Sequence, residues 1–241
     1  MRSIHKGVEP KALLAWKAEN AITPNNLHYG GGGFPAEKVR EALLAEQFHL
    51  CAYTMKSLKT AIELKGQNLD TRNSCHIDHL LPQARKISAE TIDYKNMLAC
   101  YPPSQSTIAC GYGGKIKDDY DPATDPFVSP LSLNAERHFA FAEDGEVTGV
   151  SPEGMKTVEV LKLDHKTLVN GRAAAIRGWL EPKRGHPLTA AAARRLADEV
   201  MQPDTHGCME AYCVAISTAA RAHAERLERR AARLKQKPLA P

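Results

Sequence analysis

The stretch His76-Ile77-Asp78-His79 places two imidazoles and a carboxylate within four residues. Such groups are costly to bury together unless they are paired or used. The stretch lies in the first of two strand-like runs, at 75–80 and 94–100, which a polar loop separates. Alternation along a strand puts His76 and Asp78 on one face. The sequence therefore predicts a small two-stranded unit built around chemistry-bearing side chains.

These side chains meet the needs of metal-assisted phosphodiester cleavage. Asp78 offers the anionic oxygen that a hard ion such as Mg²⁺ or Mn²⁺ prefers. His79 is the candidate general base, because a neutral imidazole accepts a proton at working pH. Asn96, whose amide both donates and accepts, is expected to hydrogen-bond across the hairpin and fix the loop that carries His79. His76 is predicted to be a second metal ligand or a phosphate contact.

Three cysteines bracket this unit, and they suggest a structural Zn²⁺ site. Such a site normally takes four Cys or His ligands, commonly as two close pairs. Cys51-x-x-Thr54 resembles a pair that has lost one member, while Cys100 and Cys110 are widely separated. Either the three cysteines bind zinc with water or another donor, or packing replaces the metal. The other cysteines have no evident partner and are expected to be buried thiols: Cys75, Cys208 and Cys213.

The net charge of +4 is unevenly distributed along the chain. Residues 221–237 hold a local excess of five positive charges, which leaves the remainder of the chain near −1. A surface that binds nucleic-acid phosphates strongly must then be local or supplied by a partner. Lys115 and Lys117 are candidate phosphate contacts, or else solvated loop charges. The basic 221–237 segment is interpreted as a solvated helix end, with nucleic-acid contact as the alternative.

The composition is that of an ordinary soluble globular protein, with 43% hydrophobic and 25% charged residues. No apolar run approaches the length of a membrane span, so no membrane association is expected. The first residues lack the apolar core of a signal peptide, which favours the cytoplasm.

The pattern of apolar and turn-forming residues predicts an α+β fold, with a small core in a mainly helical protein. Helices are expected over 10–20, 35–47, 153–162, 165–180, 188–201 and 207–235. Strands are expected over 48–53, 75–80 and 94–100, with a hairpin that joins 139–141 to 146–148 across Asp144-Gly145. The Pro and Gly content of 101–130 predicts irregular structure.

An ordered set of motifs extends over residues 1–180. It comprises Arg2-x-Ile4-x-Lys6-Gly7-x-Glu9-Pro10, Leu50-Cys51-Ala52-Tyr53, His76-Ile77-Asp78-His79-x-x-Pro82, Asp93-Tyr94-x-Asn96-Met97-Leu98, Phe127-Val128-Ser129-Pro130-Leu131, Phe139-x-Phe141, Asp144-Gly145, Thr157-Val158-x-x-Leu161-x-Leu163 and Arg172. This set resembles the bacterial HNH endonucleases, a family that includes the Septu anti-phage nuclease PtuB and putative HNH proteins of retron systems.

The resemblance implies a ββα-metal core within 48–130, with His79 as general base, Asp78 as metal ligand and Asn96 as the asparagine of the HNH set. It implies metal-dependent cleavage of nucleic acid, of DNA in the first place, and pairing with a PtuA-like ATPase in phage defence. The helical segment 1–47 is then a candidate for partner docking, with core packing an equal alternative. Residues 131–241 form the hairpin and a C-terminal helical region.

Two departures from the family pattern bear on these expectations. Thr54 stands where family members usually have a second cysteine, and Gly111 follows the last zinc cysteine, where the third HNH element is normally found. Glycine has no ligating side chain, so either Asp118, Asp119 or His76 substitutes, or the metal binds weakly. Two alternatives therefore stand beside the DNA endonuclease. One is an effector that cleaves RNA such as tRNA, and the other is a catalytically degraded subunit that works by binding.

Overall fold

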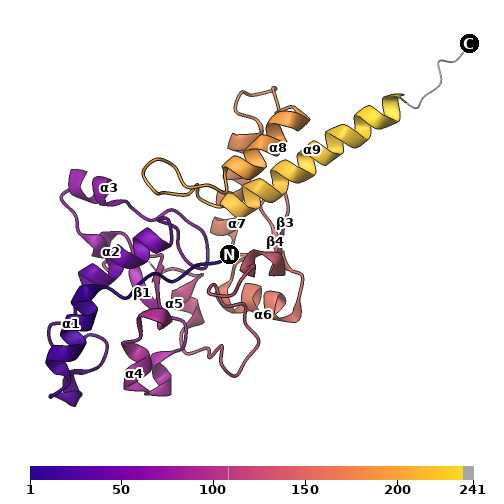
Figure 1. Ribbon diagram of the computed structural model, residues 1–241. Coiled ribbons are helices and arrows are strands. Elements are labelled where there is room, and N and C mark those ends of the chain that lie inside the picture. Colours follow the sequence, from indigo (N-terminus) through magenta and orange to yellow (C-terminus); the bar gives the residue numbers. More distant parts are fainter. Residues whose placement is uncertain (108, 236–241) are drawn as a thin grey trace, which may run out of the picture.

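The structure, a computed structural model, describes residues 1–107 and 109–235 and mixes helices with two small sheets, in agreement with the predicted α+β class. Figure 1 shows the elements α1 to α5 grouped on one side and α6 to α9 on the other, with α9 extending away from the body. One core of buried residues, with members from Met1 to Ala220, draws on all three predicted regions of the chain. The three predicted regions therefore share a core.

The predicted long helices are confirmed to within a few residues, except that α9 begins six residues late. Tyr212 takes a left-handed φ of 59° directly before α9, which separates the helix from the loop that precedes it. Three short helices, α3 to α5, were not predicted. The helices of the described residues are α1 (Lys11–Asn20), α2 (Ala36–Glu46), α3 (Ala61–Gly66), α4 (Ser88–Thr91), α5 (Gly114–Lys117), α6 (Pro152–Leu161), α7 (Lys166–Leu180), α8 (Ala190–Glu199) and α9 (Cys213–Lys235).

Two antiparallel hairpins make up the sheet structure of the described residues. Strand β1 (His76–His79) pairs with β2 (Met97–Cys100), so that His76 lies opposite Cys100 and His79 lies opposite Met97. Strand β3 (Phe139–Phe141) pairs with β4 (Val147–Gly149), which confirms the predicted hairpin. Gly145 in its turn has a φ of 88°, a conformation that glycine adopts without strain.

The strand predicted at 48–53 does not form. Phe48 and His49 have φ values of 52° and 57°, which are incompatible with an extended strand. Leu50 forms an isolated bridge with Ser57, and the intervening residues turn back into the core. The strand predicted at 94–100 is also shorter than expected. Its first three residues form a 3₁₀ turn, Tyr94–Asn96, before β2 begins.

The N-terminal segment packs between the two halves of the molecule. The Ile4 amide donates to the Pro130 carbonyl at 2.7 Å, and the Ser3 hydroxyl donates to Glu136 Oε2 at 3.0 Å. Lys6 forms an ion pair with Glu46 and also donates to a carbonyl of β2, that of Met97, at 2.9 Å. These contacts give the segment a packing role. Its partner docking stays a prediction.

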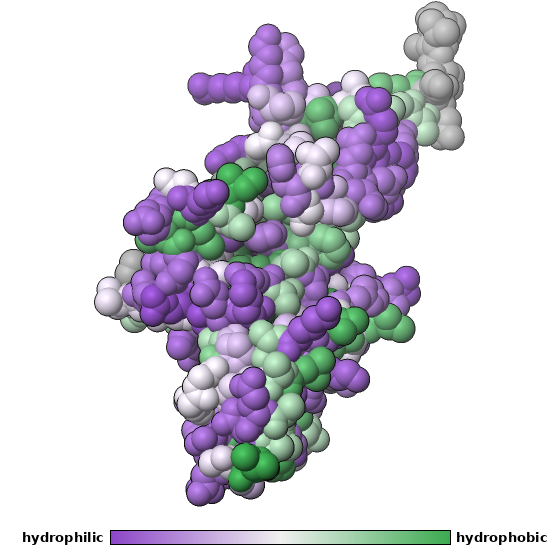
Figure 2. Space-filling model, turned by 60° about the vertical axis from the view of Figure 1, so that its left-hand side comes forward, coloured by the Kyte–Doolittle hydropathy of each residue, from purple (hydrophilic) through white to green (hydrophobic). Residues whose placement is uncertain are grey.

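The surface seen in Figure 2 is mostly hydrophilic, with apolar residues in separate patches. Within the part of the chain that the structure describes, no helix combines the length and apolar character needed to cross a membrane.

Candidate metal centre and general base

Asp78 is held in a fixed orientation on one face of β1. Its Oδ2 accepts a hydrogen bond from the Tyr53 hydroxyl at 2.7 Å. Burial, together with the charge of Asp78, raises the pKa of Tyr53 well above its usual value, so the phenol remains a neutral donor. The Asp78 side chain is 14% exposed. The carboxylate is thus oriented by a buried partner while it keeps some access to solvent.

His76 lies on the same face of β1 and presents an unpaired nitrogen to this carboxylate. Its Nδ1 is 2.6 Å from the Pro102 carbonyl oxygen, which can only accept, so Nδ1 carries the proton. Its Nε2 is buried, makes no hydrogen bond, and lies 4.0 Å from Asp78 Oδ1. On a neutral ring this nitrogen is an acceptor. Two acceptors that face each other in a buried place are stabilised by a cation between them.

The pair fits a single divalent ion. Two ligands that are each about 2.1 Å from an ion lie at most about 4.2 Å apart, so one ion can reach both Nε2 of His76 and Oδ1 of Asp78. Across residues 1–107 and 109–235, however, no group of three or more His, Cys, Asp or Glu side chains is placed to hold a metal. Asp118 and Asp119, considered as substitutes, are both exposed. The chain thus offers two ligands, and water or phosphate oxygens would have to complete the shell.

Gly114, the first residue of α5, lies against the pair. A Cβ at this position would be 2.8 Å from Asp78 Oδ1 and 3.4 Å from His76 Nε2. Sequence reasoning placed the gap in the third metal element at Gly111, at the start of the run that ends at Gly114. A Cβ at Gly111 would instead meet His165 Nε2 at 3.3 Å. The turn of α5 brings its backbone so close to Asp78 that a side chain at Gly114 has no room.

The two lysines of α5 have different surroundings. Lys115 is exposed, whereas the side chain of Lys117 is only 1% exposed. The Lys117 ammonium donates to the Leu80 carbonyl at 3.3 Å and lies 4.0 Å from Asp78 Oδ2. Lys115 is therefore open to solvent, as expected of a loop lysine, while Lys117 belongs to the surroundings of Asp78. Phosphate contact by either residue stays a prediction.

His79 lies on the opposite face of β1 from Asp78, as alternation along a strand requires. Its Nε2 is 2.9 Å from the Thr91 carbonyl oxygen and therefore carries the proton. Its Nδ1 accepts from the Gln83 side-chain amide at 3.2 Å, and the Tyr29 ring packs edge-on with centroids 4.7 Å apart. Burial lowers the pKa of His79 and outweighs the Thr91 hydrogen bond and the Asp78 charge, which raise it. The ring is thus neutral at neutral pH, with a defined tautomer.

Asn96 secures the loop between β1 and β2. Its Oδ1 accepts from the Leu81 amide at 2.7 Å, and its Nδ2 donates to the carbonyls of Leu81 at 3.1 Å and Glu90 at 3.0 Å. These are hydrogen bonds of the kind expected across the hairpin. They fix the loop that carries Gln83 and Thr91, and through these two residues they hold the ring of His79.

The structure therefore divides the predicted site residues between two faces. The hydrogen-bond and ring partners of His79 are Tyr29, Gln83 and Thr91. The Asp78 carboxylate has other neighbours, which are Tyr53, His76 and Lys117. Sequence reasoning missed Tyr53, Gln83, Thr91 and Gly114. The position of Gln83, four residues after His79, is a weak signal in the sequence, and the other three residues have none.

The cysteines predicted to bind zinc do not assemble into a ligand group. Cys51 and Cys100 are buried and hydrogen-bonded to each other, and Cys110 donates to the Tyr112 carbonyl at 3.3 Å. Burial alone would raise the pKa of Cys51, but hydrogen bonds from Cys100, Thr54 and the Tyr101 amide lower it to about 5. Thr54, at the position where the resemblance leads one to expect a second cysteine, thus donates a hydrogen bond to Cys51. Structural zinc and its alternative, packing in place of the metal, both stay predictions.

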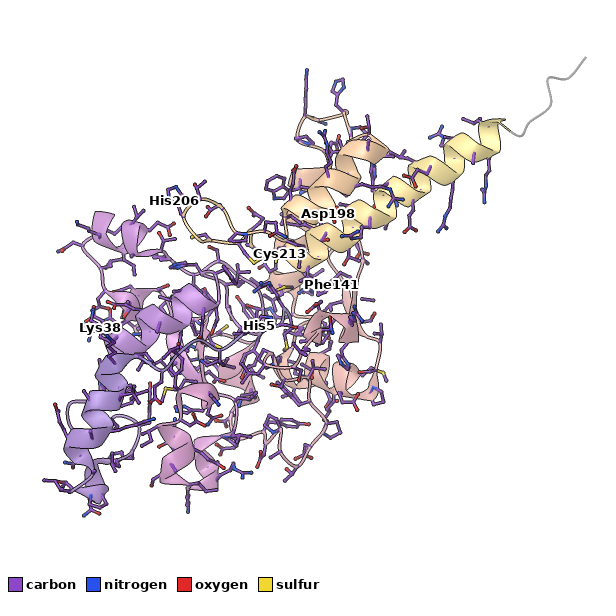
Figure 3. The ribbon with its side chains drawn as sticks, viewed as in Figure 1. His5, Lys38, Phe141, Asp198, His206 and Cys213 are labelled. Carbon is purple, nitrogen blue, oxygen red and sulfur yellow. The ribbon has the colours of Figure 1, made fainter. Side chains whose placement is uncertain are left out.

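The remaining cysteines agree in part with the expected buried thiols. Burial raises the pKa of Cys75 to about 12 and also raises that of Cys213, which begins α9 (Figure 3). Cys208 is only partly buried.

Comparison with models of known protein families and with curated proteins finds no match for this chain. Function is therefore inferred from the side chains around β1 and from the ordered motifs.

Proposed function

We propose that this protein is a metal-dependent endonuclease of the HNH type that cleaves phosphodiester bonds, with DNA as its first candidate substrate. One observation carries the proposal. The buried Nε2 of His76 has no hydrogen-bond partner and faces Asp78 Oδ1 at 4.0 Å, on the strand that also bears His79. In this proposal β1, β2 and α5 are the elements of a ββα-metal core.

Each residue has a distinct task in this mechanism. Asp78 and His76 would hold Mg²⁺ or Mn²⁺, which supplies positive charge to a phosphate oxygen when it is bound. Tyr53 orients the carboxylate through its hydrogen bond to Oδ2. Thr91 holds the Nε2 proton of His79, so that Nδ1 keeps the lone pair that takes a proton from water.

Gln83 has a second role in the proposed mechanism. Its amide occupies the Nδ1 lone pair of His79, the one that a general base needs. The amide must move aside, or pass its place to a water molecule, before His79 can accept a proton. Binding of nucleic acid to the loop between β1 and β2 is the natural trigger for this movement.

The biological setting is also part of the proposal. The ordered motifs over residues 1–180 support a role in prokaryotic anti-phage defence with a PtuA-like ATPase as partner. The nearly neutral bulk of the chain supports a partner that supplies much of the phosphate affinity. A cytoplasmic location follows from this setting.

A catalytically degraded subunit is the second candidate, and a specific observation favours it. Gly114 leaves Asp78 and His76 without a third protein ligand, and the Lys117 ammonium lies 4.0 Å from the same carboxylate. In that case the fold would act by binding a partner or nucleic acid. An RNA-cleaving effector is the third candidate and shares the site with the DNA nuclease.

The test compares wild type with His79→Ala on plasmid, single-stranded DNA and tRNA, with Mg²⁺, Mn²⁺ or a chelator, and with or without the partner. We expect metal-dependent cleavage that falls by about 100-fold or more in the variant, as for loss of a general base. His206→Ala is the matched control, because His206 is exposed in the loop before α9, away from β1 (Figure 3). Equal cleavage by His79→Ala would contradict His79 as the general base. No cleavage by wild type in any condition would contradict the endonuclease and favour the degraded subunit.

A further inference from the structure

Lys117 is a buried cation at the edge of the proposed metal centre. Its side chain is 1% exposed, and its ammonium has the Leu80 carbonyl at 3.3 Å and Asp78 Oδ2 at 4.0 Å. A buried ammonium is costly unless an opposite charge and hydrogen-bond acceptors compensate it. Asp78 is the carboxylate that compensates this one. The charge on Asp78 is therefore already shared before any metal arrives.

The two oxygens of Asp78 face different neighbours. Oδ1 lies 4.0 Å from His76 Nε2 and beside the backbone of Gly114. Oδ2 accepts the hydrogen bond from Tyr53 and lies near the ammonium of Lys117. An ion held by His76 and Oδ1 would thus share the carboxylate with the ammonium without taking its place. The effect of Lys117 on such an ion is electrostatic, since two cations act on one carboxylate in a poorly solvated place.

Helix α5 explains how the ammonium reaches this position. Gly114 lets the backbone of α5 approach Asp78, and Lys117 follows three residues later, which places it on the same side of the turn. Helix α5 therefore brings a positive charge, and no ligating side chain, to the pair of Asp78 and His76.

We propose that Lys117 is a resident cation that weakens the binding of divalent metal at Asp78 and His76, so that the site fills with metal only when an anionic phosphate enters beside both charges. This inference rests on the metal centre of the proposed function. It goes beyond that proposal because it assigns to α5 a regulatory charge in place of a ligand.

The experiment measures the affinity of the full-length protein for Mn²⁺ alone, by electron paramagnetic resonance of the free ion and by calorimetry. We expect Lys117→Met to bind Mn²⁺ about tenfold more tightly than wild type, because a like charge near the ion is removed. Lys117→Gln, which keeps a donor for the Leu80 carbonyl, should show the same gain. Asp78→Asn should remove binding, and circular dichroism shows that each variant is folded.

Lys115→Met is the matched control, since it removes a lysine of the same helix that is exposed. We expect its Mn²⁺ affinity to stay within about twofold of wild type, because solvent and salt screen an exposed charge. If the folded Lys117 variants bind Mn²⁺ no more tightly than wild type, or if none of the proteins binds it, the inference is wrong.

The outcome is independent of the nuclease test. A gain in Mn²⁺ affinity in a protein that cleaves nothing would support the resident cation and contradict the endonuclease. Cleavage by wild type, together with an unchanged Mn²⁺ affinity in both Lys117 variants, would support the endonuclease and contradict the resident cation.

Discussion

The Nε2 of His79 lies 2.9 Å from the carbonyl oxygen of Thr91, and the hydroxyl of the same threonine accepts from the Tyr29 amide at 3.2 Å. Tyr29 in turn packs its ring edge-on against His79. Two residues, 62 positions apart, thus hold one imidazole from two directions. The tautomer and the orientation of His79 are set by the Thr91 carbonyl, the Gln83 side-chain amide and the Tyr29 ring, with no charged partner at either nitrogen.

The lowered pKa of His79 predicts a dependence of stability on pH. Burial makes protonation harder in the folded state than in the unfolded state, whose value is 6.5. The folded state therefore binds fewer protons, and stability that is complete above pH 6.5 is lost as the pH falls toward the folded pKa.

We expect urea denaturation to show that the free energy of unfolding falls between pH 7.5 and pH 5. The fall should be smaller in His79→Gln than in wild type. His206→Gln, which removes an exposed histidine, is the matched control and should change the slope of the free energy of unfolding against pH less than His79→Gln does. His49 also has a lowered pKa through burial, so part of the slope remains in the variant. An unchanged slope in His79→Gln would contradict the prediction.

Asn96→Ala should destabilise the protein substantially. The substitution removes three hydrogen bonds and leaves the Leu81 amide and two carbonyls without their partner at a residue that is 6% exposed. We expect a loss of about 3 kcal/mol in the free energy of unfolding, measured by urea denaturation. Asn25→Ala, at an exposed asparagine, should change it by less than about 0.5 kcal/mol. Equal stabilities of the two variants would contradict the loop-fixing role.

Gly114→Ala tests the close approach of α5 to Asp78. The added Cβ would lie 2.8 Å from Asp78 Oδ1, so the carboxylate must move away from His76. We expect weaker Mn²⁺ binding than in wild type, measured by calorimetry. Gly178→Ala is the control, because a Cβ there meets nothing within 4 Å inside α7, and it should stabilise the helix by about 0.5–1 kcal/mol. Unchanged Mn²⁺ affinity in Gly114→Ala would show that no ion uses Oδ1.

The zinc content of the purified protein tests the cysteine cluster. Cys51 and Cys100 hydrogen-bond to each other, and Thr54 donates to Cys51. Because these contacts satisfy the buried sulfur atoms without a metal, we expect less than one zinc per chain by elemental analysis. One zinc per chain, lost in Cys51→Ser but kept in Cys208→Ser, would overturn this expectation.

Local patterns predicted those elements whose structure is determined by neighbours in sequence. The Asp144-Gly145 turn fixes the β3–β4 hairpin, and apolar periodicity located α2 and α7. The strand predicted at 48–53 does not form because these residues first close the end of α2. The amides of Phe48 and His49 donate to the carbonyls of Ala45 and Leu44, and both residues take positive φ values there.

The same distinction applies to the site. The alternation of β1 placed His76 and Asp78 on one face, and the amide chemistry of Asn96 predicted its hydrogen bonds. The proximity of Lys117 to Asp78 depends on how α5 returns across the β1–β2 hairpin. No local pattern contains that information, so a buried cation looked like a loop lysine in the sequence.

The N-terminal segment has a consequence for the order in which the chain folds. Ser3 is held by Glu136, and Ile4 is held by Pro130, at a sequence separation of more than 120 residues. During synthesis these early residues have no partner until the ribosome has released the segment around 130–136. Contacts of such long separation form late. We therefore expect the contacts of Ser3 and Ile4 to be among the last parts of this structure to form.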